Sequence, residues 1–330
     1  MAQQWKLVGD VGGTNGRFAV VDATTGKLVW RQTLAVEECP DFGDALGAFL
    51  HGVAEQGLWE ATPVDGCLAV ASGDLGQTIA FTNSSWIIDS QAVAQKLQLE
   101  RVHYLNDFEA IGYAVPDLAQ GDWIQIGDGE SKADSPMVVL GPGTGLGVCA
   151  VVPTGPRVSV LPGEGGHVDF APVDDTEVEI LRLLRTRYSR VSAERVLSGM
   201  GLQNLYWSLA TLRGVAAATD QPDDLSPAQI TAAALAGDDI AVETLRVFFR
   251  ILGGVTGNFA LAFGAHGGVY LAGGILPRLV NELLQSEFRE RFLAKGRFES
   301  YLQDIPSRLI TADDPGLEGA ARYLEKGVER

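Results

Sequence analysis

The chain has few cysteines and few basic residues, and each shortage excludes a class of protein. Only Cys39, Cys67 and Cys149 occur among 330 residues, and this odd, widely spaced set forms neither a disulfide framework nor a paired-cysteine metal site. Such usage is typical of a reducing cytosol. The 25 basic residues face 42 acidic ones, which gives a net charge of −17 and argues against nucleic acid or an anionic membrane surface as a partner.

Long hydrophobic runs and a signal segment are also missing from the pattern. No apolar stretch approaches the roughly 20 residues needed to span a bilayer, and the longest patches, such as Phe259–Phe263, are short and broken by glycine. The first residues, Met1–Lys6, do not show a basic-then-apolar signal pattern. We therefore expect a cytoplasmic protein without a membrane partner. Its hydrophobic content of 46% is ample for two domains with real cores.

Glycine, by contrast, is abundant, with 40 residues, and it marks a first turn between strands expected at 5–9 and 17–22. This turn consists of Gly9, Asp10, Val11, Gly12, Gly13, Thr14 and Asn15. Glycines let backbone N–H groups approach an anion closely, a threonine hydroxyl adds a hydrogen bond, and an acid beside a phosphate implies a metal ion between them. The turn therefore indicates a site for the phosphates of a magnesium-bound nucleotide, although Gly-Gly between strands is usually a plain hairpin turn.

A second turn of the same kind supports the functional interpretation of the first. Leu140–Gly147 contains Gly143, Thr144 and Gly145, and it again lies between an apolar run and a β-branched run, Val148–Val152. A dinucleotide-binding fingerprint needs a helix to begin at its glycines, and a Walker A loop needs Gly-Lys-Ser or Gly-Lys-Thr; neither pattern occurs. The repeat indicates a duplicated architecture with a nucleotide between the halves.

The hydrophobic pattern predicts two units of the type strand-strand-strand-helix-strand-helix, with a helical insertion in the second. For the first unit we expect strands at 5–9, 17–22, 28–34, 67–71 and 102–105 and helices at 41–56, 91–97 and 108–115. For the second we expect strands at 137–140, 147–152, 158–161, 268–272 and 308–311 and helices at 176–188, 193–197, 202–212, 227–235, 240–263, 280–293 and 317–325.

This layout resembles that of the actin-like ATPase superfamily. The expected fold class is α/β, an actin-like or ribonuclease H-like duplicated two-domain fold with a mixed β-sheet in each domain and an active-site cleft between them. The boundary is expected between Val115 and Pro136, where glycine, aspartate, serine and lysine are frequent. We therefore expect a small α/β domain at 1–115 joined by the C-terminal helix, about 315–330, and a large α/β domain with the helical insertion at 116–314.

Three segments carry side chains that suit chemistry on a sugar. Asn106-Asp107 lies where a strand meets a helix; an acid there is often only a helix cap, but in a cleft it would serve as the general base for a sugar hydroxyl that attacks a γ-phosphoryl group. The glycine-rich loop Gly163–Phe170 places Glu164 and His167 where they can bind hydroxyls. A metal site is the less favoured interpretation of this loop, because no third ligand with suitable spacing is visible.

Two further segments have a structural and a functional interpretation. Glu194 precedes a short apolar helix, where it would be a capping acid if Val191 or Ser192 began that helix. Gly273 and Gly274 end a buried strand, where they would form a tight turn or let an adenine or ribose lie flat against the backbone. Neither pair of interpretations is decided by the local sequence.

Taken together and in this order, the segments resemble the bacterial glucokinase family of actin-like, hexokinase-type sugar kinases. The resemblance covers nearly the whole chain and is carried by Gly9–Asn15, Leu105–Phe108, Gly141–Gly147, Gly163–Phe170, Glu194–Gly199 and Leu271–Ile275. The string Gly-Glu-Gly-Gly-His-Val-Asp-Phe is highly specific, whereas a lone Gly-Gly-Thr is not. The zinc-binding cysteine cluster of the related repressor, open-reading-frame and kinase family is missing, which argues against a sugar-responsive repressor.

The resemblance implies an ATP-dependent phosphorylation of D-glucose at its 6-hydroxyl group, in glycolysis, with Asp107 as the base. The ATP phosphates would lie on the Gly9–Thr14 turn and on Thr144-Gly145, Asp10 would help to place Mg²⁺ through water, and Gly273-Gly274 would contact the adenosine. Glucose would be held by Asn83, Asn106, Asp107, Glu164, His167 and Glu194. A homodimer is expected by analogy only.

Several alternatives stay open. A broader hexokinase would accept fructose or mannose, and a non-catalytic actin-like protein would sense a sugar or a nucleotide without needing Asp107 as a base. Backbone amides bind phosphates without reading the base, so GTP or polyphosphate remain possible donors.

Overall fold

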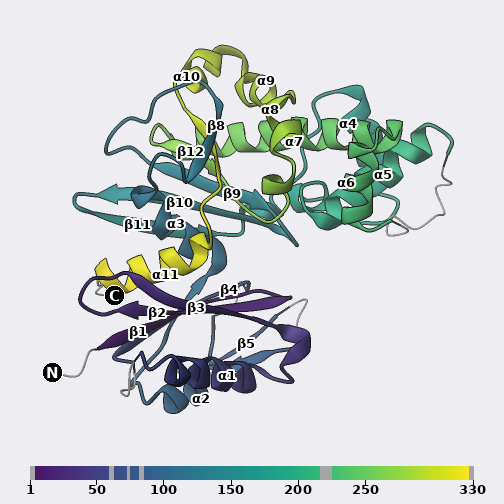
Figure 1. Ribbon diagram of the computed structural model, residues 1–330. Helices are drawn as coiled ribbons and strands as arrows, with labels where there is room; N and C mark the ends of the chain where they lie inside the picture. Colours follow the sequence, from purple (N-terminus) through teal and green to yellow (C-terminus); the bar gives the residue numbers. More distant parts are fainter. Residues whose placement is uncertain (1–3, 59–62, 73–74, 82–84, 216–224, 327–330) are drawn as a thin grey trace. The chain divides into compact units, whose positions relative to one another are not determined.

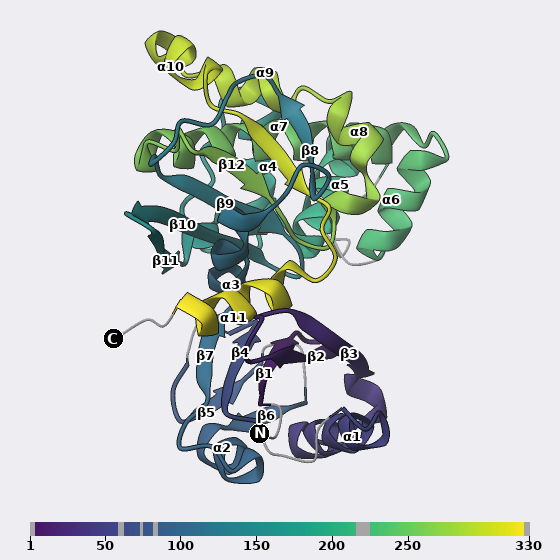
Figure 2. The same cartoon turned by 60° about the vertical axis from the view of Figure 1, so that its left-hand side comes forward.

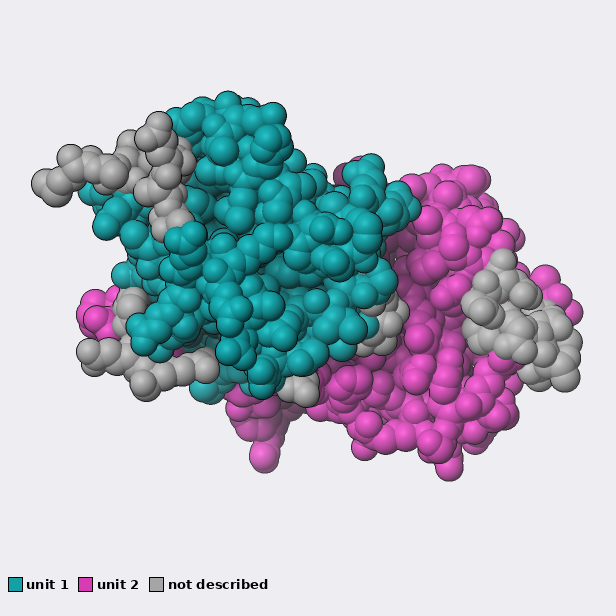
Figure 3. All heavy atoms as spheres, turned by 90° about the horizontal axis from the view of Figure 1, so that it is seen from below, with its two compact units in different colours: residues 1–119, 160–162, 312–330 teal, residues 120–159, 163–311 magenta. Residues whose placement is uncertain are grey.

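The computed structural model, whose elements are labelled in Figure 1 and Figure 2, describes residues 4–58, 63–72, 75–81, 85–215 and 225–326. It divides into two compact units (Figure 3): unit 1 comprises residues 1–119, 160–162 and 312–330, and unit 2 comprises residues 120–159 and 163–311. These units are compact by their internal contacts, and the domain boundaries expected from the sequence stay a prediction.

Unit 1 is built on a five-stranded mixed sheet in the order β3-β2-β1-β4-β7. Its strands are β1 (Trp5–Val11), β2 (Asn15–Asp22), β3 (Leu28–Ala35), β4 (Asp65–Val70) and β7 (His103–Asn106). The first three are antiparallel, whereas β4 and β7 run parallel to β1, with Val11 opposite Val70 and Val70 opposite Asn106. Because these parallel strands end in register, the first glycine turn and Asp107 lie at the same edge of the sheet.

Helices cover both faces of this sheet (Figure 1). On one face lie α1 (Phe42–Glu55) and α2 (Ser90–Leu97), and on the other lie α3 (Asp107–Ala114) and α11 (Pro315–Lys326). The core under α1 contains Phe18 and Phe49, with ring centroids 5.4 Å apart. The backbones of α3 and α11 approach each other closely at Gly319. A Cβ added to Gly319 would lie 1.7 Å from the carbonyl oxygen of Ala110, so only glycine permits this approach.

Unit 2 repeats the scheme with a six-stranded sheet in the order β11-β10-β9-β12-β13-β8. Its strands are β8 (Trp123–Gly127), β9 (Met137–Pro142), β10 (Leu146–Thr154), β11 (Arg157–Gly163), β12 (Gly268–Leu271) and β13 (Ser307–Ile310). Strands β9 and β10 form an antiparallel hairpin and β12 runs parallel to β9, with Leu140 opposite Leu271. The second glycine turn and Gly273 therefore follow neighbouring strand ends, as in unit 1.

The helices of unit 2 are α4 (Asp175–Leu184), α5 (Gly199–Leu212), α6 (Pro227–Leu235), α7 (Asp239–Phe263), α8 (Val280–Leu284), α9 (Phe288–Leu293) and α10 (Glu299–Gln303). Helix α7 packs on β9 and β12 and forms much of the core (Figure 2). By length and composition alone α7 could cross a membrane, which the sequence interpretation overlooked, but 67% of its most apolar window is buried inside the unit. That burial is typical of a core helix.

Three predicted helices end or break where side chains compete for the backbone. The helix expected at 176–188 ends at Leu184, and Thr186 donates its hydroxyl to the carbonyl of Leu183 (2.7 Å). The helix expected at 280–293 splits because Ser286 donates to the carbonyl of Leu283 and accepts from the N–H of Phe288. The segment 193–197 forms only a 3₁₀ turn, Ala193–Arg195, where Ser198 and Asn204 donate to the carbonyls of Glu194 and Arg195, each at 2.8 Å. These predictions were wrong because local hydrogen bonds offer the backbone alternative partners.

The sequence interpretation also missed short elements. These are the hairpin of β5 (Thr78–Ala80) and β6 (Ile87–Asp89), the edge strand β8, the helix α10 and several 3₁₀ turns. Each spans only three to five residues, which is too short for a hydrophobic period to show.

Candidate functional site

The first turn carries a partly buried acid that faces an arginine. Asp10 and Arg17 are directly opposite each other in the β1–β2 pair, and Oδ2 of Asp10 lies 3.2 Å from Nη1 of Arg17. Nε of Arg17 lies 3.2 Å from Oδ1 of Asp314, so Arg17 stands between two carboxylates. The turn itself is closed by a hydrogen bond from the N–H of Gly12 to the carbonyl of Asn15 (3.0 Å). The sequence could have shown the Asp10–Arg17 pair, because a hairpin places them as cross-strand neighbours.

The environment of Asp10 suits a carboxylate that shares a cation with a ligand. Burial raises the pKa of Asp10 above its ordinary value of 3.8, the charge of Arg17 lowers it and that of Asp314 raises it. Within the described residues no group of three or more His, Cys, Asp or Glu could hold a metal ion. Mg²⁺ commonly binds one or two carboxylates together with water and substrate phosphates. A single carboxylate such as that of Asp10 is enough for this manner of binding.

Asn106 and Asp107 lie at the start of α3, and the cap is Asn106. Its Oδ1 accepts from the N–H groups of Phe108 (3.0 Å) and Glu109 (3.4 Å), and its Nδ2 donates to the carbonyl of Ser72 (3.3 Å). Asp107 is the first helical residue, is partly exposed, and accepts from the N–H of Phe108 at 2.9 Å. Asn106 is therefore the cap residue and shares the N–H of Phe108 with Asp107. The Asp107 carboxylate lies at the positive end of the helix dipole.

The second turn lies against the glycines that follow β12. The N–H of Gly143 donates to the carbonyl of Gly145 (2.8 Å), and the N–H of Gly199 donates to the carbonyl of Gly143 (2.9 Å). Gly273 has φ of +88°, and a Cβ added to it would lie 2.5 Å from the carbonyl oxygen of Pro142. Glycine is thus required at 273, and Thr144 is left exposed at the tip of the turn.

The carboxylates of Glu164 and Glu194 both lie near the imidazole of His167. The three residues come from two segments of unit 2. Nε2 of His167 lies 3.8 Å from Oε2 of Glu164, and Nδ1 lies 4.0 Å from Oε1 of Glu194. Glu164 and His167 are exposed, whereas the Glu194 side chain is 30% exposed. Carboxylates that accept and an imidazole that donates or accepts make a suitable set for several hydroxyl groups of one small ligand.

The structure shows that Glu194 does not cap the segment that follows it. The 3₁₀ turn at Ala193–Arg195 has no side-chain cap, and the following helix α5 is capped by Ser198, which accepts from the N–H of Gly201 (3.0 Å). The capping interpretation of Glu194 is therefore wrong. Its Oε2 instead accepts the N–H of Leu146 (3.0 Å), at the end of the second turn.

Sequence reasoning missed the contacts that support the His167 loop. Arg190 donates from Nε to Oδ1 of Asp169 (2.7 Å) and also bonds the carbonyl of His167. The N–H of Ala193 donates to the carbonyl of Val168 (2.8 Å), beside a bridge between Asp169 and Ser192. The loop that carries Glu164 and His167 is thereby paired with the segment that leads to Glu194. No local sequence pattern predicts that these two segments pair.

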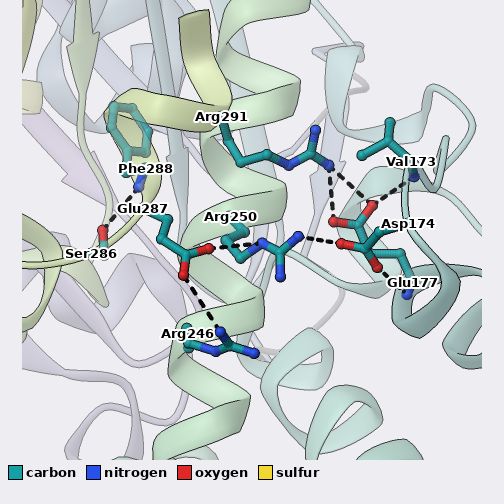
Figure 4. Close-up of polar contacts among 9 residues, drawn as sticks. All are labelled: Val173, Asp174, Glu177, Arg246, Arg250, Ser286, Glu287, Phe288 and Arg291. Atoms are coloured by element: carbon teal, nitrogen blue, oxygen red, sulfur yellow. Dashed lines mark hydrogen bonds and ion pairs between the residues drawn. The ribbon is translucent and has the colours of Figure 1, made fainter. Parts of the chain in front are cut away.

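The loop is also anchored at its far end, where α4 begins (Figure 4). Asp174 caps α4 and bonds Arg250 of α7, and Arg250 in turn lies 3.1 Å from Glu287. Glu177 accepts from Arg291 at 2.9 and 3.1 Å and from the N–H of Val173 at 2.9 Å. Glu177 is only 2% exposed, so this ion pair lies inside the unit and fixes the backbone that follows the loop.

Asn83 lies outside the described residues. The remaining site residues group by unit: the 9–15 turn, Asn106 and Asp107 belong to unit 1, and the 143–145 turn, Glu164, His167, Glu194, Gly273 and Gly274 belong to unit 2.

Comparisons with known proteins bear on the whole chain. A family model described as Glucokinase matches residues 7–327. The glucokinase of Hahella chejuensis is 42% identical over 323 residues, which are 98% of this chain and 97% of that protein. The crystal structure of glucokinase from an Antarctic psychrotroph has a TM-score of 0.84 and 35% identity, and covers 98% of this chain and 99% of that one.

A more distant structure shares the fold. The ROK family glucokinase from Streptomyces griseus, solved in complex with glucose and AMPPNP, has a TM-score of 0.64 and 20% identity, and the match covers 98% of this chain and all of that one. The α/β fold with a mixed sheet in each unit is thus that of actin-like sugar kinases, as the sequence predicted.

Proposed function

This chain belongs to the glucokinase family and phosphorylates glucose, and from that premise we propose that ATP is the donor, the 6-hydroxyl group the acceptor and Asp107 the general base. The assignment of the sugar-binding residues rests on one observation: the carboxylates of Glu164 and Glu194 both lie near the imidazole of His167. These three residues were predicted from segments thirty residues apart, and a set of hydroxyl-binding groups is their shared chemistry.

The role proposed for Asp107 follows from its position. Phosphoryl transfer needs positioning and charge stabilisation more than covalent help, so the protein must orient one hydroxyl group and remove its proton. Asn106 caps α3, and the Asp107 carboxylate lies beside it at the start of the helix, where it accepts the N–H of Phe108 and where we assign it the removal of that proton. Asn106 keeps one further N–H, because its amide nitrogen carries two protons and donates one to Ser72.

The donor is assigned to the two glycine turns. We assign the ATP phosphates to the 9–15 turn and to Gly143, Thr144 and Gly145, and the adenosine to Gly273 and Gly274. Mg²⁺, when bound, neutralises charge on the phosphate oxygens, and Asp10 would hold it through water. The AMPPNP in the Streptomyces griseus structure supports ATP as the nucleotide. A cytoplasmic location, a place in glycolysis, a homodimeric state and the lack of nucleic-acid or membrane partners belong to the same proposal.

A coupled assay across sugars and donors tests this proposal. Glucose, fructose and mannose are each supplied with ATP, GTP or polyphosphate, and formation of the 6-phosphate is followed. We expect the highest kcat/KM with glucose and ATP. Comparable kcat/KM for fructose or mannose would instead indicate a broad hexokinase, a preference for polyphosphate or GTP would refute the donor assignment, and no turnover with any pair would indicate a sensor.

A further inference from the structure

The two carboxylate oxygens of Glu194 face different parts of unit 2. Oε2 accepts the N–H of Leu146 at 3.0 Å, and Leu146 is the first residue of β10, directly after the 143–145 turn. Oε1 lies 4.0 Å from Nδ1 of His167. One side chain thus joins the turn assigned to the phosphates to the cluster assigned to the sugar.

The sequence of the turn is adapted to this contact. A Cβ added to Gly145 would lie 2.5 Å from Oε2 of Glu194, so a larger residue at 145 would displace the carboxylate. A Cβ added to Gly143 would have nothing nearer than the backbone nitrogen of Gly274, at 3.9 Å, which is an ordinary contact. The two glycines therefore differ: the one at 145 makes room for Glu194, and the one at 143 does not.

We propose that Glu194 is a positioning residue for the 143–146 turn, through which glucose and the nucleotide bind cooperatively. The inference rests on the proposed function, since it takes the sugar cluster and the phosphate turn as assigned there. A sugar hydroxyl on Oε1 would fix the Glu194 carboxylate, and the hydrogen bond from Leu146 to Oε2 would then hold the turn. The conformational entropy of this side chain is lost once for both ligands, so each ligand raises the affinity for the other by the same factor.

Titration calorimetry of the whole protein with glucose and with Mg-AMPPNP, each alone and in the presence of the other, measures this factor. We expect about fivefold or more in the unmodified protein, the lower end of typical coupling. In E194Q an amide oxygen still accepts from Leu146 while the negative charge is gone. We therefore expect E194Q to bind glucose about tenfold more weakly and to bind AMPPNP alone as the unmodified protein does.

E194A removes both contacts and separates the two roles. We expect E194A to lose glucose affinity, to bind AMPPNP alone several-fold more weakly than E194Q does, and to show a coupling factor near one. Equal AMPPNP affinity in E194A, E194Q and the unmodified protein would overturn the inference, as would a coupling factor of one in the unmodified protein.

G145A and G143A form a matched pair for glucose binding without nucleotide. We expect G145A to weaken glucose binding several-fold, because its methyl group displaces Glu194, and G143A to leave glucose binding unchanged. Equal glucose affinity in G145A and the unmodified protein would overturn the inference even if E194A failed to fold. Failure of the proposed function has a different signature: the unmodified protein would not bind glucose, or E194A and E194Q would bind it as tightly as the unmodified protein.

Discussion

At the scale of single residues, neighbouring side chains carry separate tasks. Asn106 caps α3, and the adjacent Asp107 carboxylate accepts the N–H of Phe108. One carboxylate oxygen of Glu194 accepts the backbone N–H of Leu146, and the other faces His167. Arg17 contacts both Asp10 and Asp314. Substitutions at these positions should therefore separate binding from turnover.

Asp107→Ala is expected to lower kcat by about a thousandfold, the range for loss of a general base, while the Kd of glucose changes little. Steady-state kinetics and calorimetric glucose binding on the same preparation check this. Asp107→Asn is the control, because it keeps an oxygen for the N–H of Phe108 but cannot accept a proton. Near-normal turnover in either variant would end the base assignment.

Glu164→Ala is expected to raise the KM for glucose about tenfold or more, since a hydrogen bond to a charged group is lost. The KM for ATP should change much less. Initial rates over a matrix of glucose and ATP concentrations provide the measurement. An unchanged glucose KM would mean that the Gly163–Phe170 loop has been misassigned.

Asp10→Asn should separate stability from activity. Burial raises the pKa of Asp10 above 3.8, so the folded state disfavours the charged form. The contribution of Asp10 to stability is full below pH 3.8 and is lost as the pH rises through the raised folded pKa. At pH 7 the Tm of Asp10→Asn should therefore equal or exceed that of the unmodified protein, while kcat/KM for Mg-ATP falls by about a hundredfold. A clearly lower Tm, or retained activity, would contradict this.

At the scale of elements, the loop that bears Glu164 and His167 depends on what lies at its two ends. Strand β11 leads into it, and the capped start of α4 follows it. Arginines from α7 and α9 reach this start, Arg250 to Asp174 and Arg291 to Glu177 (Figure 4). The position of the loop is thus determined by helices far along the chain, and by buried charge in particular.

Glu177→Ala is expected to destabilise unit 2 by about 3–5 kcal/mol, because it leaves Arg291 buried without its partner. Urea unfolding followed by circular dichroism gives the measurement. The exposed pair of Arg190 and Asp169, with side chains 56% and 78% exposed, is the control, and Asp169→Ala should cost about 1 kcal/mol or less. Equal losses in the two variants would refute the argument from burial.

At the scale of the whole molecule, acidic residues exceed basic ones by 17. A surface with this balance repels anions at long range, so phosphates must be attracted locally, by backbone amides, helix N-termini and a metal ion. The long apolar helix α7 does not alter this picture, since most of its apolar window lies inside unit 2.

We therefore expect the protein to bind neither anionic vesicles nor DNA at about 0.15 M salt. Co-sedimentation with phosphatidylserine vesicles and an electrophoretic mobility shift assay check the two parts. Neutral phosphatidylcholine vesicles serve as the control. Sedimentation with both kinds of vesicle would show that α7 or another apolar surface is available to lipid.

Local pattern was enough for the features that depend on neighbours in the chain. Apolar and β-branched runs around two glycine–threonine turns predicted both hairpins, and β1–β2 and β9–β10 confirm them. Helix ends were predicted less well, because Ser286 and Thr186 form hydrogen bonds with the backbone that interrupt a hydrophobic period.

What the sequence by itself determined is the residue types of each segment: glycines where a backbone must come close, and acids and a histidine where hydroxyls or a metal can bind. The tertiary structure alone decided which of these segments meet, as in the contacts of Glu194 with Leu146 and of Arg17 with Asp314. The physical reason is that a hairpin or a helix turn follows from residues a few positions apart. A contact between distant segments follows only from the packing of whole sheets and helices.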